Sequence, residues 1–548
     1  MTINITINMM NTKVIRSLQL CFLMGVSVAM AMAADAADSP FVIALRGKPP
    51  QSLSPADAYT VNDLAVIGQI MEGLVKFNPR NPTAPPELNL ASARFEIDPL
   101  TYIFEIRGDV VFHPFPGHPH DALTAEDVAF SIEYSMNRFR DRLDNIERIE
   151  FYGKHLKIKL KRPMKDFMAV LATSAGYVTS KRYFDSLGRN EQERYERFRR
   201  APIGTGPYLL RAPLRVTSST ITVERFSGYR DRTWASSRLS LSTVTFRFYD
   251  DPQAILQDIA AGKVTLTSLP ATEFGVGVDV RGKGSFVRLT PPFLALLTIN
   301  TRKAPLGDER TRQLLNAAVD VSEVVRICQT DLTDLPPGYR KYMPIPLEYL
   351  QSGTPSLKPM LSDRTTRLRL EALRRAGPLV ILAPARPDHT MDKILERIGI
   401  DFKRNLGIDV IIRKEQAVSP ETIAAEQPDL IYREWTPDIP WENADLSILE
   451  PLFASGSRNN FGGYRDKSLD DSLDLLKSIT DPGITEKVYK DIQKRLQQGA
   501  PLIWLPIVRE MTLFLDKGYR ATYAAPSANS TSTLVFYTTM LKDIRKRS

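Results

Sequence analysis

The strongest constraint on the fold is a strict alternation of apolar and polar residues at 155–161, which read His-Leu-Lys-Ile-Lys-Leu-Lys. Because successive side chains of a β-strand point to opposite faces, this pattern predicts a strand with one face in a core and the other in water. Residues 101–107 have the same character. Between them, Thr124 precedes two acidic residues and a run with helical spacing, which predicts a helix capped by Thr124. Mixed strand and helix signals of this kind indicate an α/β or α+β protein.

Acidic residues mark two further helix starts. For the paired acids Asp250 and Asp251, it is the resemblance to a known family, given below with its sequence blocks, that implies a place before a helix, where capping explains the pair. Another helix is expected to begin near Asp308 and to run towards Val325. The mixture of strands and helices therefore continues into the second half of the chain.

Cysteine usage limits how the fold can be stabilised. The chain of 548 residues has 2 cysteines, and Cys21 lies in an N-terminal segment that we expect to be removed. The remaining Cys328 cannot form an intrachain disulfide, and thiolate metal sites need several cysteines. With 43% hydrophobic residues, a chain of this length can instead be stabilised by large buried cores.

The N-terminus has the organisation of a secretory signal peptide. Lys13 and Arg16 precede an uncharged apolar stretch over 18–32, and small residues in an A-x-A pattern follow it. We therefore predict a cleaved signal peptide over 1–33. The alternative, a transmembrane anchor, is disfavoured because the apolar run is shorter than the ~20 residues of a spanning helix. We expect the mature protein to be exported and soluble.

Composition and motifs argue against two classes of function. The net charge of +9 is small for this length and the basic residues are spread widely, whereas nucleic-acid binders concentrate them on one face. The sequence contains no Walker loop, no H-E-x-x-H and no G-x-S-x-G, and Gly204-Thr-Gly206 lacks the third glycine of a dinucleotide-binding turn. We expect no nucleic-acid partner, no catalytic residues and no cofactor. A secreted hydrolase is retained as the alternative from another class.

A series of short blocks in a fixed order carries a family resemblance. The blocks are 41–47, 54–57, 69–77, 100–107, 111–113, 123–131, 203–208, 248–252, 260–264, 297–301 and 460–464. Together they resemble the extracytoplasmic solute-binding proteins of ABC importers, in the large family that binds oligopeptides, dipeptides and nickel. The resemblance extends over nearly the whole mature chain.

This resemblance implies a two-lobed periplasmic-binding-protein fold of the type II, Venus-flytrap kind, an α/β architecture with an extra α+β subdomain in the first lobe. A hinge of this type works because contacts from both lobes to the ligand exist only in the closed state. We expect a periplasmic monomer that delivers its solute to the permease subunits of an ABC transporter. The implied division is lobe one at 40–58, 203–290 and 505–548, the subdomain at 59–202, and lobe two at 291–504.

The segment from Arg433 to Trp441 is the most informative candidate for the binding site. It contains two of the chain's 4 tryptophans in a stretch interrupted by prolines. The resemblance implies that Trp435 lines the cleft and that Asp438 holds the ammonium group of a ligand, and we add Thr436 and Trp441 as candidate contacts. Relatives usually carry glycine where this chain has Glu434, a difference that bears on ligand specificity. The alternative is an ordinary core Trp pair with Asp438 in a turn.

Two other sites are weaker candidates. Tyr59 and Thr60 follow the first strand, where relatives contact ligand from the opposite lobe, and the alternative is that both are simple loop residues. His113, His118 and His120 bring together three of the chain's 5 histidines, which suggests a nickel or metal-chelate branch of the family. Against that reading, His113 belongs to a family block. The favoured function is capture of a peptide or similar small amine-bearing solute.

Overall fold

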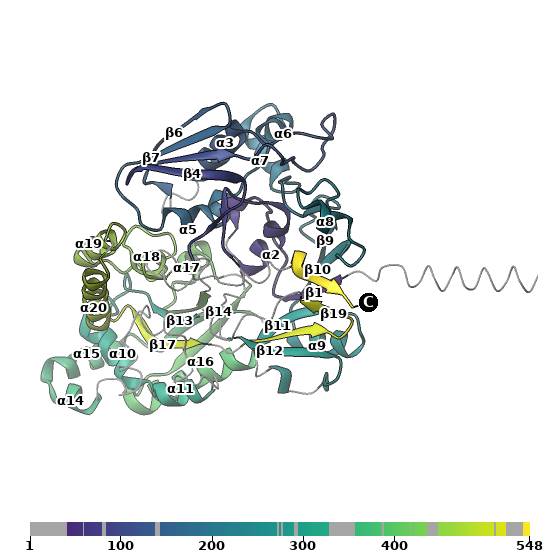
Figure 1. Cartoon of the computed structure of the whole chain (residues 1–548). Helices are drawn as coiled ribbons and strands as arrows, with labels where there is room; N and C mark the ends of the chain where they lie inside the picture. The colour runs from purple at the N-terminus through teal and green to yellow at the C-terminus, as the bar shows by residue number, and fades with distance from the viewer. Residues whose placement is uncertain are drawn as a thin grey trace, which may run out of the picture.

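The computed structural model describes a large part of the chain and contains several sheets (Figure 1). The described residues are 41–58, 60–78, 84–137, 143–270, 273–275, 278–289, 294–327, 357–385, 388–416, 418–435, 448–479, 481–508, 511–521 and 541–547. Among them, no helix combines the length and the apolar character that crossing a bilayer requires.

The first large sheet has seven strands, and we call it lobe one. In spatial order its strands are β12 (Gly284–Leu289), β18 (Met511–Asp516), β11 (Leu266–Pro270), β1 (Phe41–Arg46), β10 (Thr243–Tyr249), β9 (Thr220–Arg225) and β8 (Tyr208–Leu210). The central strand β1 runs parallel to both of its neighbours, β10 and β11. The outer strands pair in antiparallel fashion.

The second large sheet has five strands, and we call it lobe two. Its spatial order is β15 (Val410–Glu415), β14 (Leu379–Pro384), β16 (Leu430–Trp435), β13 (Leu294–Ile299) and β17 (Leu502–Val508). Strand β14 is parallel to β15 and β16, whereas β13 is antiparallel to β16 and β17. The chain passes between the two sheets twice, from β12 to β13 and from β17 back to β18.

A third, four-stranded antiparallel sheet lies at the top of Figure 1 with α3, α6 and α7 beside it. Its order is β4 (Ala91–Asp98), β5 (Thr101–Ile106), β7 (His155–Leu160) and β6 (Ile146–Tyr152). The predicted strand at 155–161 is β7, in which Leu156, Ile158 and Leu160 are each 0% exposed. Short pairs join β2 (Val75–Lys76) to β3 (Glu87–Leu88) and β19 (Tyr519–Ala521) to β20 (Ile544–Lys546).

Helices cover these sheets, and several begin where the acidic pattern predicted. The helices are α2 (Val61–Ile70), α3 (Ala125–Met136), α5 (Phe167–Leu171), α6 (Lys181–Ser186), α7 (Glu191–Phe198), α8 (Arg232–Ser236), α9 (Pro252–Ala260), α10 (Glu309–Ala318), α11 (Val321–Ile327), α14 (Leu357–Ser362), α15 (Arg364–Arg375), α16 (His389–Leu406), α17 (Pro420–Glu426), α18 (Glu450–Phe453), α19 (Lys467–Leu476) and α20 (Pro482–Gly499).

The predicted caps at Thr124 and Asp251 are confirmed. Thr124 forms a reciprocal capping box at the start of α3, and the Asp251 side chain accepts a hydrogen bond from the N–H of Gln253. The helix expected from Asp308 to Val325 is wrong in its extent, because α10 ends at Ala318 and α11 begins at Val321. Asp320 causes the break, since its carboxylate accepts a hydrogen bond from the N–H of Glu323 and so starts a new helix.

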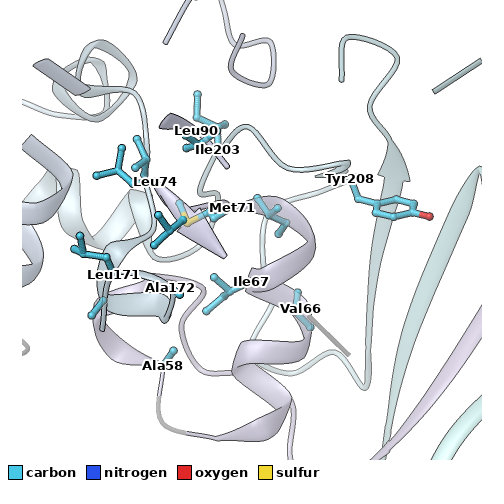
Figure 2. Close-up of a cluster of buried hydrophobic side chains, with 14 of the residues drawn as sticks. Ala58, Val66, Ile67, Met71, Leu74, Leu90, Leu171, Ala172, Ile203 and Tyr208 are labelled. Atoms are coloured by element: carbon cyan, nitrogen blue, oxygen red, sulfur yellow. The ribbon is translucent and has the colours of Figure 1, made fainter. Parts of the chain in front are cut away.

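A continuous hydrophobic core joins the four-stranded sheet to lobe one. Figure 2 shows part of it, where Ile67 of α2 and Met71, the residue that follows the helix, lie among side chains from Leu74, Leu171 and Ala172. The same cluster includes residues of β5 and β7 and residues of β1 and β10. Lobe two has a separate core, built around β13, β14 and β16 with α10, α16 and α20.

Candidate functional site

The carboxyl ends of two parallel strands lie at one edge of lobe two. Strands β14 and β16 are aligned with Ile381 opposite Leu430, so their carboxyl ends, at Pro384 and Trp435, are on the same side of the sheet. In open α/β sheets, ligands bind outside the carboxyl ends of the strands. Ligand contacts from lobe two are therefore expected at this edge.

The carboxyl end of the central strand of lobe one faces the same edge. Arg46 ends β1, and its Nη2 lies 2.5 Å from Oδ2 of Asp388. Asp388 follows β14 and caps α16 by accepting a hydrogen bond from the N–H of Met391 at 3.0 Å. The ion pair thus joins the two lobes across the edge, and both side chains are largely buried, with exposed fractions of 11% for Arg46 and 0% for Asp388.

Thr60 lies on the lobe-one side of this region and has a structural role. It begins α2, with its hydroxyl oxygen accepting a hydrogen bond from the N–H of Asp63 and its own N–H donating to the Asp63 carboxylate. Asn62, in the first turn of the same helix, donates to the backbone carbonyls of Arg46 and Lys48. The start of α2 is therefore fixed next to the end of β1, and Thr60 itself is exposed.

On the lobe-two side, Trp435 is the last residue of β16. It is partly exposed, packs against the core of lobe two and pairs with Leu294 of the neighbouring strand. The guanidinium of Arg433 lies 5.1 Å from the centroid of its ring. Trp435 is thus partly a core residue and partly a residue of the edge at which β14 and β16 end.

The neighbouring Glu434 lies on the other face of β16. Successive side chains of a strand alternate, so Glu434 shares a face with Tyr432, whose hydroxyl donates to its carboxylate at 3.5 Å. Arg433 and Trp435 share the opposite face. Tyr59, Thr436, Asp438 and Trp441 lie outside the described residues, and their roles stay predictions.

The histidine cluster is not a preformed metal site in the described structure. His113 is buried, its Nε2 donates to the carbonyl of Gly206 at 2.9 Å, and its Nδ1 accepts from the N–H of Gly204. Burial lowers the pKa of His113 to about 4, so the ring is neutral. The ring of His118 stacks on Phe115. No group of three or more potential metal ligands occurs among the described residues.

These contacts also explain the glycines of the 203–208 block. A Cβ atom on Gly204 would lie 2.4 Å from the carbonyl oxygen of Ile70, and one on Gly206 would lie 2.5 Å from that of Gln69. The block therefore packs directly on the end of α2, where only glycine fits. The block therefore contributes to the packing of lobe one against the four-stranded sheet.

Sequence reasoning missed two residues of the edge, Arg46 and Arg433. Arg46 pairs with a residue 342 positions away, which no local pattern indicates. Arg433 stands two residues before the predicted Trp435, so its place on the same strand face was a signal that could have found it.

Comparison with known proteins decides the family. A model of the bacterial extracellular solute-binding proteins, family 5, matches residues 86–456, more than half of the chain. The chain belongs to this family. Its members bind solutes and are not enzymes, which removes the hydrolase alternative.

Named relatives of this family 5 protein bind different cargo. The probable di/tripeptide-binding protein 5 of Pseudomonas aeruginosa (strain UCBPP-PA14) is 24% identical over 486 residues, covering 82% of this chain and 86% of the relative. The structure of the periplasmic binding protein DppA of Helicobacter pylori in complex with the peptide STSA matches with a TM-score of 0.74 and 19% identity, covering 93% and 98% of the two chains. NikZ of Campylobacter jejuni in complex with Ni(L-His) matches with a TM-score of 0.72 and 20% identity, covering 92% and 99%.

These matches confirm the family resemblance and the predicted α/β periplasmic-binding-protein fold. Because only about one residue in five is identical, the likeness to the solved structures shows a shared fold.

Proposed function

We propose that this protein captures a peptide or a similar small amine-bearing solute between its two lobes in the periplasm and delivers it to the permease subunits of an ABC importer. The observation that carries the proposal is the meeting of two strand edges. The carboxyl ends of β1 in lobe one and of β14 and β16 in lobe two face one another and are joined by Arg46 and Asp388. Family membership supplies the solute-binding role.

The proposed contacts come from both lobes. Thr60 and Tyr59 approach from lobe one, and Trp435, Thr436, Asp438 and Trp441 approach from lobe two. Asp438 is proposed to hold the ammonium group, because a carboxylate and an ammonium group that are both shielded from water form a strong charge-assisted hydrogen bond. Export rests on the proposed signal peptide at 1–33.

A peptide is favoured over a metal ion bound by the chain's own histidines. His113 already uses both ring nitrogens for backbone groups of the 203–208 block, and it is neutral and buried. The similarity to the probable di/tripeptide-binding protein 5 of Pseudomonas aeruginosa supports the same choice.

The test is a search for a bound solute followed by titration. Native mass spectrometry of the purified protein should show a small co-purifying solute, and the ligand-free protein should gain thermal stability when that solute or a short peptide is added, as mass action requires. Asp438→Asn should weaken binding of an amine-bearing ligand and leave binding of its N-acetylated form unchanged. A protein that neither carries nor binds any peptide or amine would refute the proposal.

A further inference from the structure

Helix α15 and the short helix α14 before it carry a concentration of positive charge. Residues 357–375 contain six basic and two acidic residues, a net charge of +4, whereas the whole chain of 548 residues has a net charge of +9. All five basic residues of α15 are arginines. Basic residues are spread widely over the sequence as a whole, and this helix is a local exception.

The exposed residues of α15 form a stripe along the helix. On its opposite side, Leu370 and Leu373 are buried and pack into the core of lobe two. A row of exposed side chains recurs at helical spacing, and we call it the basic stripe: Arg364, Arg367, Leu368, Glu371 and Arg375. With a rise of about 1.5 Å per residue, the stripe is roughly 16 Å long. Its charges are therefore presented in a line on the surface of the protein.

The arginines of the basic stripe are not neutralised by the described part of the chain. The side chain of Arg364 has neither an ion pair nor a hydrogen bond to another described residue. Arg367 donates to two backbone carbonyls at the end of α14, at 3.0 and 2.7 Å, and these neutral acceptors leave its charge in place. Arg375 lies 3.5 Å from Glu371, but both side chains are exposed, and exposed pairs contribute little. Three guanidinium groups therefore remain available to an external anion.

The two other arginines of α15 differ, because both have partners inside lobe two. The Nε of Arg369 lies 2.7 Å from Oδ1 of Asp308, and this ion pair joins α15 to the start of α10. The Nε of Arg374 donates to the carbonyl oxygen of Leu406, the last residue of α16, at 2.7 Å. Packing within the lobe therefore accounts for these two arginines and not for the exposed ends of the basic stripe.

The location of α15 suits contact with an extended surface. Figure 1 shows α14 and α15 at the lower left, at the rim of lobe two and at the opposite end of the molecule from the four-stranded sheet. Strands β1 and β14 lie away from this rim in the same view. A partner that contacts the basic stripe therefore leaves the region between the two lobes open to solute.

We propose that the basic stripe binds the surface of a membrane that contains anionic phospholipids. Guanidinium groups form paired hydrogen bonds with phosphate oxygens, and every cation of the stripe is an arginine. Leu368, with an exposed fraction of 53%, lies between the arginines and adds an apolar contact that suits a lipid interface. A line of charges on a convex helix matches a plane of headgroups. The inference goes beyond the proposed function, and it holds for any solute that the lobes capture.

The test is sedimentation of the protein with vesicles of defined composition. The chain that remains after removal of the predicted signal peptide is used, because the apolar leader at 1–33 would itself insert into lipid. Vesicles of phosphatidylglycerol and phosphatidylcholine in equal parts are compared with vesicles of phosphatidylcholine alone. We expect binding to the anionic vesicles only, weakened by about 10-fold or more between roughly 0.1 and 0.5 M salt, because salt screens exposed charges.

The double variant Arg364→Gln with Arg375→Gln tests the stripe itself. An arginine near an anionic surface contributes about fivefold to binding, so loss of both should weaken binding to anionic vesicles by about 25-fold. Both side chains are exposed, so the melting temperature should stay that of the wild type. The matched control is Arg211→Gln with Arg281→Gln, which removes the same charge from exposed positions of lobe one. This control should bind within about twofold of the wild type, because charges far from the contact are screened.

Equal binding to neutral and anionic vesicles, or no binding to either, would refute the inference. Equal weakening by the two double variants would also refute it, since the overall charge and not the basic stripe would then drive binding. Binding to immobilised polyglutamate without binding to anionic vesicles would assign the stripe to an acidic protein and overturn the membrane as its partner. Solute capture is measured separately, so each of these outcomes leaves the proposed function standing.

Discussion

The buried His113 makes a quantitative prediction about acid sensitivity. Its pKa in the folded protein is about 4, against an ordinary value of 6.5, because burial disfavours the charged ring. As the pH falls, the unfolded chain therefore takes up this proton first. The stability that the neutral ring contributes is complete above pH 6.5 and is lost as the pH falls towards 4.

The size of the effect follows from the shift. With ~1.4 kcal/mol for each pKa unit, the full displacement corresponds to roughly 3 kcal/mol, of which about 2 kcal/mol falls between pH 7 and pH 5. The assay is urea unfolding of wild type and His113→Gln at these two pH values, followed by circular dichroism. His113→Gln should be less stable than the wild type at pH 7, since it loses hydrogen bonds to Gly204 and Gly206. Between pH 7 and pH 5, the free energy of unfolding of His113→Gln should fall by about 2 kcal/mol less than that of the wild type.

The matched control is His120→Gln, because His120 lies in the same segment and is exposed. This variant should lose stability between the two pH values as the wild type does. If His113→Gln shows the same loss as the wild type, the neutral buried state of His113 is refuted.

Three further predictions concern the packing of the lobes. Glu72 accepts hydrogen bonds from Arg230; burial alone would raise the pKa of Glu72, but Arg230 outweighs burial and the pKa is lowered. Glu72→Gln should therefore leave the buried Arg230 charge unpaired and lower the free energy of unfolding in urea at pH 7 by about 3–5 kcal/mol. A decrease below about 1 kcal/mol would contradict this. Gly206→Ala should lower the melting temperature by several degrees, because the added Cβ would lie 2.5 Å from the backbone oxygen of Gln69. Gly108→Ala is the control and should change the melting temperature little, since no atom lies within 4 Å of a Cβ at that position. Equal effects of the two variants would argue against the close approach of Gly206 to the backbone of α2. Asp388→Asn keeps a capping side chain but removes the charge that pairs with Arg46, and so weakens a contact between the lobes. Small-angle scattering of the ligand-free variant should therefore show a larger radius of gyration than that of the wild type. An unchanged radius would count against the ion pair as a contact between lobes.

Local patterns predicted the parts of the fold that depend on local physics. The alternation at 155–161 gave the correct buried face of β7, because a strand with one wet face has to alternate. The caps at Thr124 and Asp251 were predictable because a side chain bonds a backbone group two or three residues away. The break between α10 and α11 was missed, since Asp320 looks like an ordinary helical residue until its side chain is seen to cap the second helix.

The site was harder to predict because its contacts are distant in sequence. The segment around Trp435 was proposed from its residues and the family resemblance, and its role stays a prediction, whereas the pairing of Arg46 with Asp388 depends on how two sheets meet. The same limit explains the histidines. Their closeness in sequence suggested a metal site, whereas the ring of His113 is directed to a block more than 90 positions further on.

The continuous core around α2 has a consequence for how this protein comes apart. The four-stranded sheet shares its buried side chains with lobe one, while lobe two keeps its own. Three sheets should therefore melt as two cooperative units, and calorimetry should resolve two transitions at most. Excising the segment 59–202 would remove α2 and strip lobe one of the surface against which it folds. We therefore expect that lobe one cannot fold without the four-stranded sheet.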